Sequence, residues 1–130
     1  MEEMDQSVPD LKGKLVYIAE DDQASGAYLK EILAPTSAEL ILVRNGKELT
    51  DQIKEIIPDI ILLDMNMPVK SGFDCLSEIR KVNKNIKIIA QTAYAMDNER
   101  IKCMEMGCND YISKPINKDE LFIVIRRVMN

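Results

Sequence analysis

The sequence contains no histidine, and this absence removes several kinds of chemistry. Without an imidazole the chain cannot by itself form a Ser-His-Asp triad, a histidine metal site or a phosphohistidine. Carboxylate, lysine and threonine side chains must therefore carry any chemistry that the chain performs alone.

Cysteine is scarce, and no apolar run is long. Cys75, Cys103 and Cys108 form no CxxC pair and leave one thiol over in any disulfide scheme, and no apolar signal segment precedes them. These features favour reduced thiols and a cytoplasmic location. The apolar runs are too short to span a bilayer, so we expect no membrane contact by this domain.

Basic residues are also outnumbered: 17 Lys and Arg stand against 22 Asp and Glu, giving a net charge of -5. A protein that binds the phosphate backbone usually presents an excess of basic side chains, so we expect no direct binding of nucleic acid. The length of 130 residues and the content of 46% hydrophobic residues are typical of a single domain.

The chain divides into a short tail and one folded unit. Residues 1–13 are polar, contain proline and glycine and show no periodicity, which predicts a tail or linker. From Lys14 to Asn130, short apolar runs alternate with amphipathic stretches. The predicted strands are 15–19, 39–43, 59–63, 86–91 and 110–113, and the predicted helices are 24–33, 46–56, 72–82, 98–106 and 119–129.

This alternation predicts an α/β domain with a five-stranded, doubly wound parallel sheet, because each crossover helix must return the chain across the sheet. Residues that commonly start or end helices lie at the expected places. Pro35 and Pro58 follow the first two predicted helices, and Asn117 with Glu120 three residues later is typical of a helix start.

Polar residues follow four of the predicted strands, at the sheet edge where doubly wound domains gather their functional groups. They are Glu20, Asp21 and Asp22 after the first strand, Asp64 after the third, Thr92 after the fourth and Lys114 after the fifth. Acids after a strand often only cap the next helix, and Asp22 is well placed to do so.

Together these residues indicate a site for phosphate. Carboxylates gathered at one sheet edge repel each other unless a cation holds them, and a few hard oxygen ligands suit Mg²⁺. Asp21 and Asp64 would bind the ion directly and Glu20 through water. Lys114 would add a second positive charge and Thr92 a hydroxyl donor. We therefore expect Asp64 to be a nucleophile for a phosphoryl group.

At this point four motifs resemble a known family. "EDD" after the first strand, "LLDMNMPVKSG" around Asp64, "TAYA" from Thr92 and "GCNDYISKPI" ending the fifth strand are similar to the receiver domains of two-component response regulators. The resemblance covers Lys14 to Asn130. It implies a flavodoxin-like (βα)5 fold with strand order 2-1-3-4-5.

The resemblance also implies a role for each site residue. It makes Asp64 the phosphoacceptor, which takes a phosphoryl group from a phosphohistidine donor with Mg²⁺ as cofactor. The fourth helix, fifth strand and fifth helix then switch for signalling. A cis peptide is implied between Lys114 and Pro115. The implied metal ligands are Glu20, Asp21, Asp64 and the backbone carbonyl of Asn66, the phosphate contacts are Thr92 and Lys114, and the switch residues are Thr92 and Tyr111.

The leader "PDLKGK" and the stretch "TAYAMDNERIKCMEMGCNDYISKPI" are most similar to receivers of hybrid sensor histidine kinases. This subtype implies a histidine kinase or histidine phosphotransfer domain as donor, and a downstream protein or output domain as recipient of the signal. A homodimer is a further option. The domain would be a self-modifying signalling unit in the cytoplasm, alone or within a membrane-anchored hybrid kinase, and not an enzyme with a separate substrate.

Three alternatives remain at this stage. A haloacid-dehalogenase-like phosphatase also forms an aspartyl phosphate, but it needs a second acid where this chain has Asn66. A flavodoxin-like cofactor binder needs a Ser-, Thr- or Gly-rich phosphate cradle, whereas "EDD" repels a phosphate that brings no metal. A degenerate receiver that serves only as a docking module would keep the same residues without using them.

Overall fold

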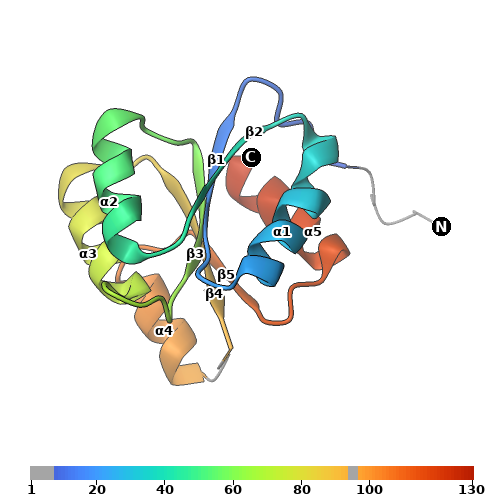
Figure 1. Ribbon diagram of the computed structural model, residues 1–130. Coiled ribbons are helices and arrows are strands. Elements are labelled where there is room, and N and C mark those ends of the chain that lie inside the picture. Colours follow the sequence, from blue (N-terminus) through green and yellow to red (C-terminus); the bar gives the residue numbers. More distant parts are fainter. Residues whose placement is uncertain (1–7, 94–96) are drawn as a thin grey trace.

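The computed structural model, which describes residues 8–93 and 97–130, has one parallel sheet with helices on both faces (Figure 1). Neighbouring strands all run parallel, in the order β2-β1-β3-β4-β5. This arrangement confirms the predicted doubly wound, flavodoxin-like fold. The strands are β1 (Leu15–Ala19), β2 (Glu39–Val43), β3 (Ile60–Asp64), β4 (Lys87–Thr92) and β5 (Asp110–Ser113).

The helices divide between the two faces of the sheet. Figure 1 shows α1 and α5 on one face and α2, α3 and α4 on the other. A short 3₁₀ turn, η1 (Ala34–Thr36), extends the end of α1 through Pro35, where the sequence predicted a plain stop. The helices are α1 (Gln23–Leu33), α2 (Gly46–Glu55), α3 (Gly72–Val82), α4 (Asp97–Glu105) and α5 (Lys118–Met129).

The central strand β3 explains why the sheet needs cover on both sides. All five of its residues are buried, with Ile61 and Leu63 packed in the layer under α2 and α3, and Ile60 and Leu62 in the layer under α1 and α5. Continuous apolar runs of this kind are typical of parallel strands that lose both faces to helices. The α1 and α5 layer also includes Leu11, which lies before the Lys14 boundary expected from the sequence.

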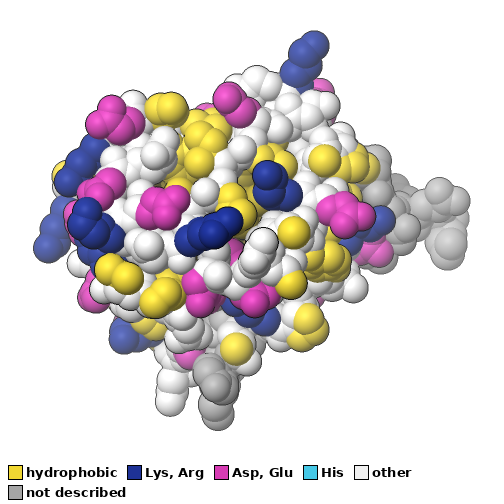
Figure 2. Space-filling view, viewed as in Figure 1, with side chains coloured by type: hydrophobic (Ala, Val, Ile, Leu, Met, Phe, Trp, Pro, Cys, Tyr) yellow, Lys and Arg dark blue, Asp and Glu magenta, His cyan; other side chains and the backbone are white. Residues whose placement is uncertain are grey.

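The edge strand β2 is more open than the centre of the sheet, with only Val43 fully buried. On the face of the molecule seen in Figure 2, which is viewed as in Figure 1, hydrophobic side chains are visible between side chains of both charge signs. No helix in the described part of the chain combines the length and apolar character that a membrane span requires.

Side-chain caps mark the starts of three helices that follow strands. Asn45 caps α2, Ser71 caps α3, and the Asn117 side chain accepts a hydrogen bond from the Glu120 backbone N–H at 3.0 Å. The expected cap of α5 is therefore confirmed. These caps fix where α2, α3 and α5 begin, and so they anchor the ends of the loops that leave the carboxyl edge of the sheet.

Candidate phosphorylation site

Three acidic side chains meet at the carboxyl edge of the sheet. Glu20 follows β1 and Asp64 ends β3, and these strands are hydrogen-bonded neighbours in which Ala19 faces Leu63. One carboxylate oxygen from each of Glu20, Asp21 and Asp64 lies within 4.8 Å of the others. Glu20 and Asp64 are each only 2% exposed, whereas Asp21 is exposed. The structure thus brings together three acids that the sequence singled out.

Lys114 supplies the opposing charge from the end of β5. Its ammonium nitrogen lies 2.9 Å from Oδ2 of Asp64 and 3.1 Å from Oε2 of Glu20. The peptide between Lys114 and Pro115 is cis, as the resemblance implied. The backbone N–H of Lys114 also donates to the carbonyl of Thr92 at 2.9 Å, which fixes the lysine to the end of β4.

The electrostatics of this cluster are dominated by burial and by the paired acids. Burial, and then the charge of Asp64, raise the pKa of Glu20, while Lys114 opposes both effects. For Lys114, burial lowers the pKa, but hydrogen bonds to Asp64 and Glu20 outweigh it and leave the pKa raised. The raised pKa keeps Lys114 charged, and a bound cation would relieve the burial and repulsion that raise the pKa of Glu20.

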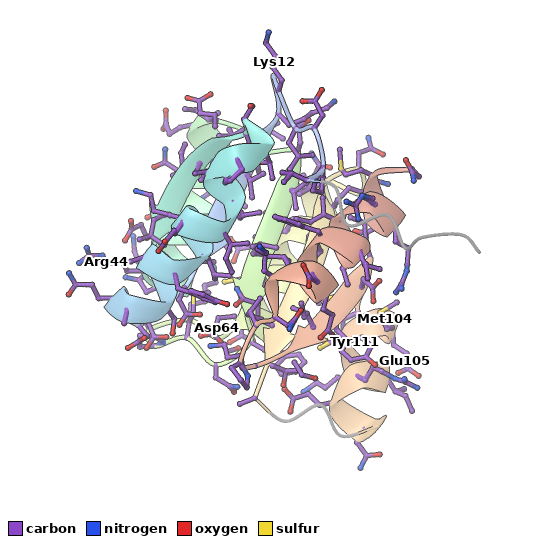
Figure 3. All side chains as sticks on the ribbon, turned by 90° about the vertical axis from the view of Figure 1, so that its right-hand side faces the viewer. Lys12, Arg44, Asp64, Met104, Glu105 and Tyr111 are labelled. Atoms are coloured by element: carbon purple, nitrogen blue, oxygen red, sulfur yellow. The ribbon has the colours of Figure 1, made fainter. Side chains whose placement is uncertain are left out.

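The second carboxylate oxygen of Asp64, Oδ1, is hydrogen-bonded by the loop that follows this residue. The backbone N–H of Asn66 donates to Oδ1 of Asp64 at 3.0 Å, and the Asn66 side chain is exposed. Figure 3 shows Asp64 at the lower end of the sheet, where the loops gather. The two oxygens of Asp64 thus have different partners, a backbone amide and an ammonium group.

The side chain of Asp22 caps the next helix and is not one of the three grouped carboxylates, although its backbone N–H donates to Oε1 of Glu20 at 3.2 Å. Its carboxylate accepts hydrogen bonds from the backbone N–H of Ser25 at 2.9 Å and from the Ser25 hydroxyl at 2.7 Å. These bonds lower the pKa of Asp22. The capping interpretation of Asp22 is therefore confirmed.

Thr92 and Tyr111 are both tied to α4. Thr92 is fully buried, and its hydroxyl donates to the carboxylate of Glu99. The half-buried Tyr111 accepts a hydrogen bond from Arg100 at 3.2 Å, and the guanidinium lies 5.5 Å from the ring centroid. Tyr111, labelled in Figure 3, packs against the core layer that α2, α3 and α4 cover. Two residues of the "TAYA" motif, at positions 94 and 95, lie outside the described residues.

Sequence reasoning missed three residues that bear on this region. In the sequence, Glu99 and Arg100 look like ordinary charged residues of an exposed helix. Only the fold shows that Glu99 contacts Thr92 and that Arg100 contacts Tyr111. In the sequence, Gln91 looks like no more than the polar last residue of an apolar strand. In the structure its side chain is buried. Strand alternation places Gln91 on the same face as Ile89, so its burial could have been found from the sequence.

Comparison with known proteins decides the family. The family described as "Response regulator receiver domain" matches this chain over residues 16–126. The chain is a receiver domain. It belongs to two-component signal transduction, whose receivers are phosphorylated on aspartate, and this membership sets aside the phosphatase and flavodoxin-like alternatives.

Receiver domains from very different proteins are similar to it. It is 35% identical over 119 residues to hybrid signal transduction histidine kinase I of Dictyostelium discoideum, covering 85% of this chain but 7% of that protein. It is 32% identical over 117 residues to the chemotaxis protein CheY of Thermotoga maritima, covering 89% of this chain and 98% of that one. The receiver thus corresponds to a small part of one relative and to nearly all of another.

Solved structures agree with the fold. The magnesium-bound receiver domain of sensor histidine kinase PA1611 from Pseudomonas aeruginosa is 29% identical, with a TM-score of 0.81, over 90% of this chain and 98% of that one. The receiver domain of a signal transduction histidine kinase from Syntrophus aciditrophicus is 26% identical, also with a TM-score of 0.81, over 90% of both chains.

Proposed function

We propose that Asp64 takes a phosphoryl group from a phosphohistidine on a histidine kinase or histidine phosphotransfer domain. The observation that carries this proposal is the pairing of a nearly buried Asp64 carboxylate with the Lys114 ammonium at 2.9 Å, beside two further acids. A carboxylate held in this way is oriented and charge-balanced, and positioning with charge neutralisation does most of the work in phosphoryl transfer.

The donor set fits Mg²⁺. Glu20, Asp21 and Asp64 offer three carboxylates against the single ammonium of Lys114, and hard oxygen donors near open solvent are what Mg²⁺ prefers. Asp21 and Asp64 would hold the ion directly, Glu20 through water, and Asn66 through its backbone carbonyl. When bound, the ion would neutralise charge on the phosphoryl oxygens.

The residues of the receiver do the rest of the transfer. An oxygen of Asp64 forms the new bond to phosphorus while the bond to the donor nitrogen breaks, and the electron pair leaves with the donor imidazole. Lys114 balances the charge on the phosphoryl oxygens, and the hydroxyl of Thr92 donates a hydrogen bond to one of them. The receiver therefore catalyses its own phosphorylation without acting on a separate substrate. It would also catalyse its own dephosphorylation, in which a water oxygen bonds to phosphorus while the bond to the Asp64 oxygen breaks and Asp64 leaves as the carboxylate.

Phosphorylation would be read on the face formed by α4, β5 and α5. Thr92 would turn from Glu99 toward the phosphoryl oxygen, and Tyr111 would move inward from its contact with Arg100. A downstream protein, an output domain or a second copy of the chain would bind the altered face. Only contacts that differ between the two states can shift such an equilibrium.

The context proposed for the receiver follows its similarity to hybrid kinases. Residues 14–130 would form the receiver domain and residues 1–13 a tail or linker, with Leu11 anchoring its end through a 2.8 Å hydrogen bond from its backbone N–H to the carbonyl of Thr36. The domain would work in the cytoplasm, either alone or as part of a membrane-anchored hybrid kinase.

Labelling with a small phosphodonor tests the assignment of Asp64. With Mg²⁺ and acetyl phosphate, intact-mass analysis should show one added phosphoryl group on the wild type and none on Asp64→Asn or after chelation. Asp22→Asn is the matched control, because asparagine caps a helix as well as aspartate does and the Asp22 carboxylate is not one of the three grouped acids. Full labelling of Asp64→Asn would show that another residue accepts phosphate.

A further inference from the structure

The side chain of Lys70 joins the loop after Asp64 to two helices at once. Its ammonium group donates to the hydroxyl of Thr50 in α2 at 3.2 Å and forms an ion pair with the carboxylate of Glu78 in α3. The Lys70 side chain is only 27% exposed, and Thr50 is buried. One side chain thus ties this loop to two of the helices that cover the same face of the sheet (Figure 1).

The backbone of Lys70 lies just as close to α2. A Cβ atom at Gly46, the first residue of α2, would collide with the carbonyl oxygen of Lys70 and come within 2.7 Å of its Cβ atom, so only glycine fits there. The Thr50 hydroxyl that accepts from Lys70 also lies 3.2 Å from the Gly46 carbonyl, to which it donates. Lys70 is therefore held against the first turn of α2 through its backbone and through its side chain.

Little slack separates Lys70 from Asn66, four residues earlier in the loop. At one end of this span, the backbone N–H of Asn66 donates to Oδ1 of Asp64 at 3.0 Å. Within it, the ring of Pro68 fixes one backbone torsion, and the N–H of Lys70 donates to the Pro68 carbonyl at 2.7 Å in a three-residue turn. The backbone of Asn66 thus lies on a short span between two fixed points, Asp64 and Lys70.

We propose that Lys70 is a positioning residue for the metal site. By fixing the far end of this span to Thr50 and Glu78, its ammonium group holds the backbone carbonyl of Asn66 in place for Mg²⁺. The inference rests on the proposed function, in which that carbonyl is a metal ligand. Lys70 needs no contact with the ion, because it acts through the loop, as outer partners of metal ligands do.

The sign of the effect separates positioning from simple electrostatics. Lys70→Met keeps an unbranched side chain but removes the ammonium group. Removing a positive charge near a cluster of acids would by itself strengthen the binding of a cation, whereas loss of positioning weakens it. Changes to groups that contact a metal ligand directly typically weaken metal binding by about 10–100-fold. Because Lys70 acts through the loop, we expect Lys70→Met to bind Mg²⁺ about 3–10-fold more weakly than the wild type.

An NMR titration of the unphosphorylated protein with MgCl₂, followed at the backbone amide of Asn66, measures this affinity. Lys70→Arg keeps a charged donor that can reach both partners, so it should retain the wild-type affinity. Thr50→Val removes one partner of Lys70 without changing any charge, and it should weaken binding in the same direction as Lys70→Met.

Lys47→Met is the matched control for charge. Lys47 lies in the first turn of α2 and pairs with Asp51 of the same helix at 2.6 Å, so the variant loses a positive charge and an ion pair but leaves Lys70 in place. It should bind Mg²⁺ at least as tightly as the wild type.

Two results would overturn the role of Lys70 while leaving the metal site intact. One is an affinity for Mg²⁺ in Lys70→Met and Thr50→Val that equals or exceeds that of the wild type. The other is equal weakening by Lys70→Met and Lys70→Arg, because the arginine variant keeps the charge. If the wild type itself gave no saturable shift at Asn66, the proposed metal site would fail, and the inference would fail with it.

Discussion

Val69 adopts a backbone conformation that its side chain disfavours. Its φ is +69°, which is uncommon for any residue with a Cβ and rarer still for a β-branched one. The backbone N–H of Lys70 donates to the carbonyl of Pro68 at 2.7 Å, closing a three-residue turn around Val69. The side chain is 78% exposed, so little burial compensates for this strain. The turn belongs to the loop that joins Asp64 to α3.

Replacing Val69 by glycine should therefore stabilise the fold. Relief of a left-handed conformation is worth about 1–2 kcal/mol, and the greater freedom of glycine in the unfolded chain offsets about 0.5–1 kcal/mol. Urea unfolding of Val69→Gly should show a net gain of about 0.5–1 kcal/mol. Val82→Gly is the matched control, because Val82 is 82% exposed but helical, and it should lose stability. Equal losses in both variants would mean that Val69 is not strained.

At the scale of the element, polar contacts that phosphorylation would disturb join α4 to the sheet within the described residues. Glu99 accepts from the Thr92 hydroxyl, and Arg100 donates to Tyr111 one strand further on. The two contacts leave from adjacent residues of one helix. A change at Thr92 therefore acts on the same helix segment that restrains Tyr111.

Removing the carboxylate of Glu99 should mimic part of the phosphorylated state. Glu99→Ala takes away the acceptor that competes with a phosphoryl oxygen for Thr92, and a hydrogen bond to a charged group is worth about 1.5–3 kcal/mol. In the wild type, beryllofluoride stands in for the phosphoryl group and should shift the NMR signals of Tyr111, Ile101 and Met104. Glu99→Ala should show part of the same shifts without beryllofluoride.

Glu105→Ala, at the exposed end of the same helix, controls for a general loss of acidic charge and should leave these signals in place. Thr92→Ala should weaken the response to beryllofluoride while Asp64 still binds it. Unchanged Tyr111 signals in Glu99→Ala would show that the contact between Thr92 and Glu99 does not restrain the switch.

The elements themselves were largely predictable, because they follow from local rules. The predicted helix 72–82 has the same bounds as α3, since Ser71 caps it and its apolar residues repeat with helical spacing. The strands β3 and β4 begin one residue later than predicted, a normal uncertainty at element ends. The 3₁₀ turn at Ala34–Thr36 escaped prediction, because proline signals only that an α-helix cannot continue.

Pairings between elements were predictable only where the sheet fixes them. Parallel strands bring their carboxyl ends to one edge, so the meeting of Glu20 and Asp64 followed from the alternation of strands and helices. The contact of Thr92 with Glu99 depends on how α4 is set against the sheet, which no local pattern encodes. The conformation of Val69 opposes its own propensity, so the sequence gives no signal for it.

At the scale of the whole molecule, the three cysteines lie in the same core layer, between the sheet and α2, α3 and α4. Cys75, Cys103 and Cys108 are all buried among the side chains that join the sheet to α2, α3 and α4. Burial raises the pKa of Cys75 to about 11 and that of Cys108 to about 12, and it also raises the pKa of Cys103. Since the thiolate is the reactive form, the folded protein should carry almost none at neutral pH.

Thiol labelling should therefore measure unfolding of this layer. At pH 8 a thiol reagent such as dithionitrobenzoate should react with none of the three cysteines in the folded protein at an appreciable rate, because the reagent lacks access and the thiols stay protonated. The rate should rise with urea in parallel with global unfolding. Val82→Cys, at a position where the native side chain is 82% exposed, should label at once and serves as the positive control. Rapid labelling of Cys103 and Cys108 but not Cys75 in the absence of urea would instead show that α4 opens independently of the rest of the core.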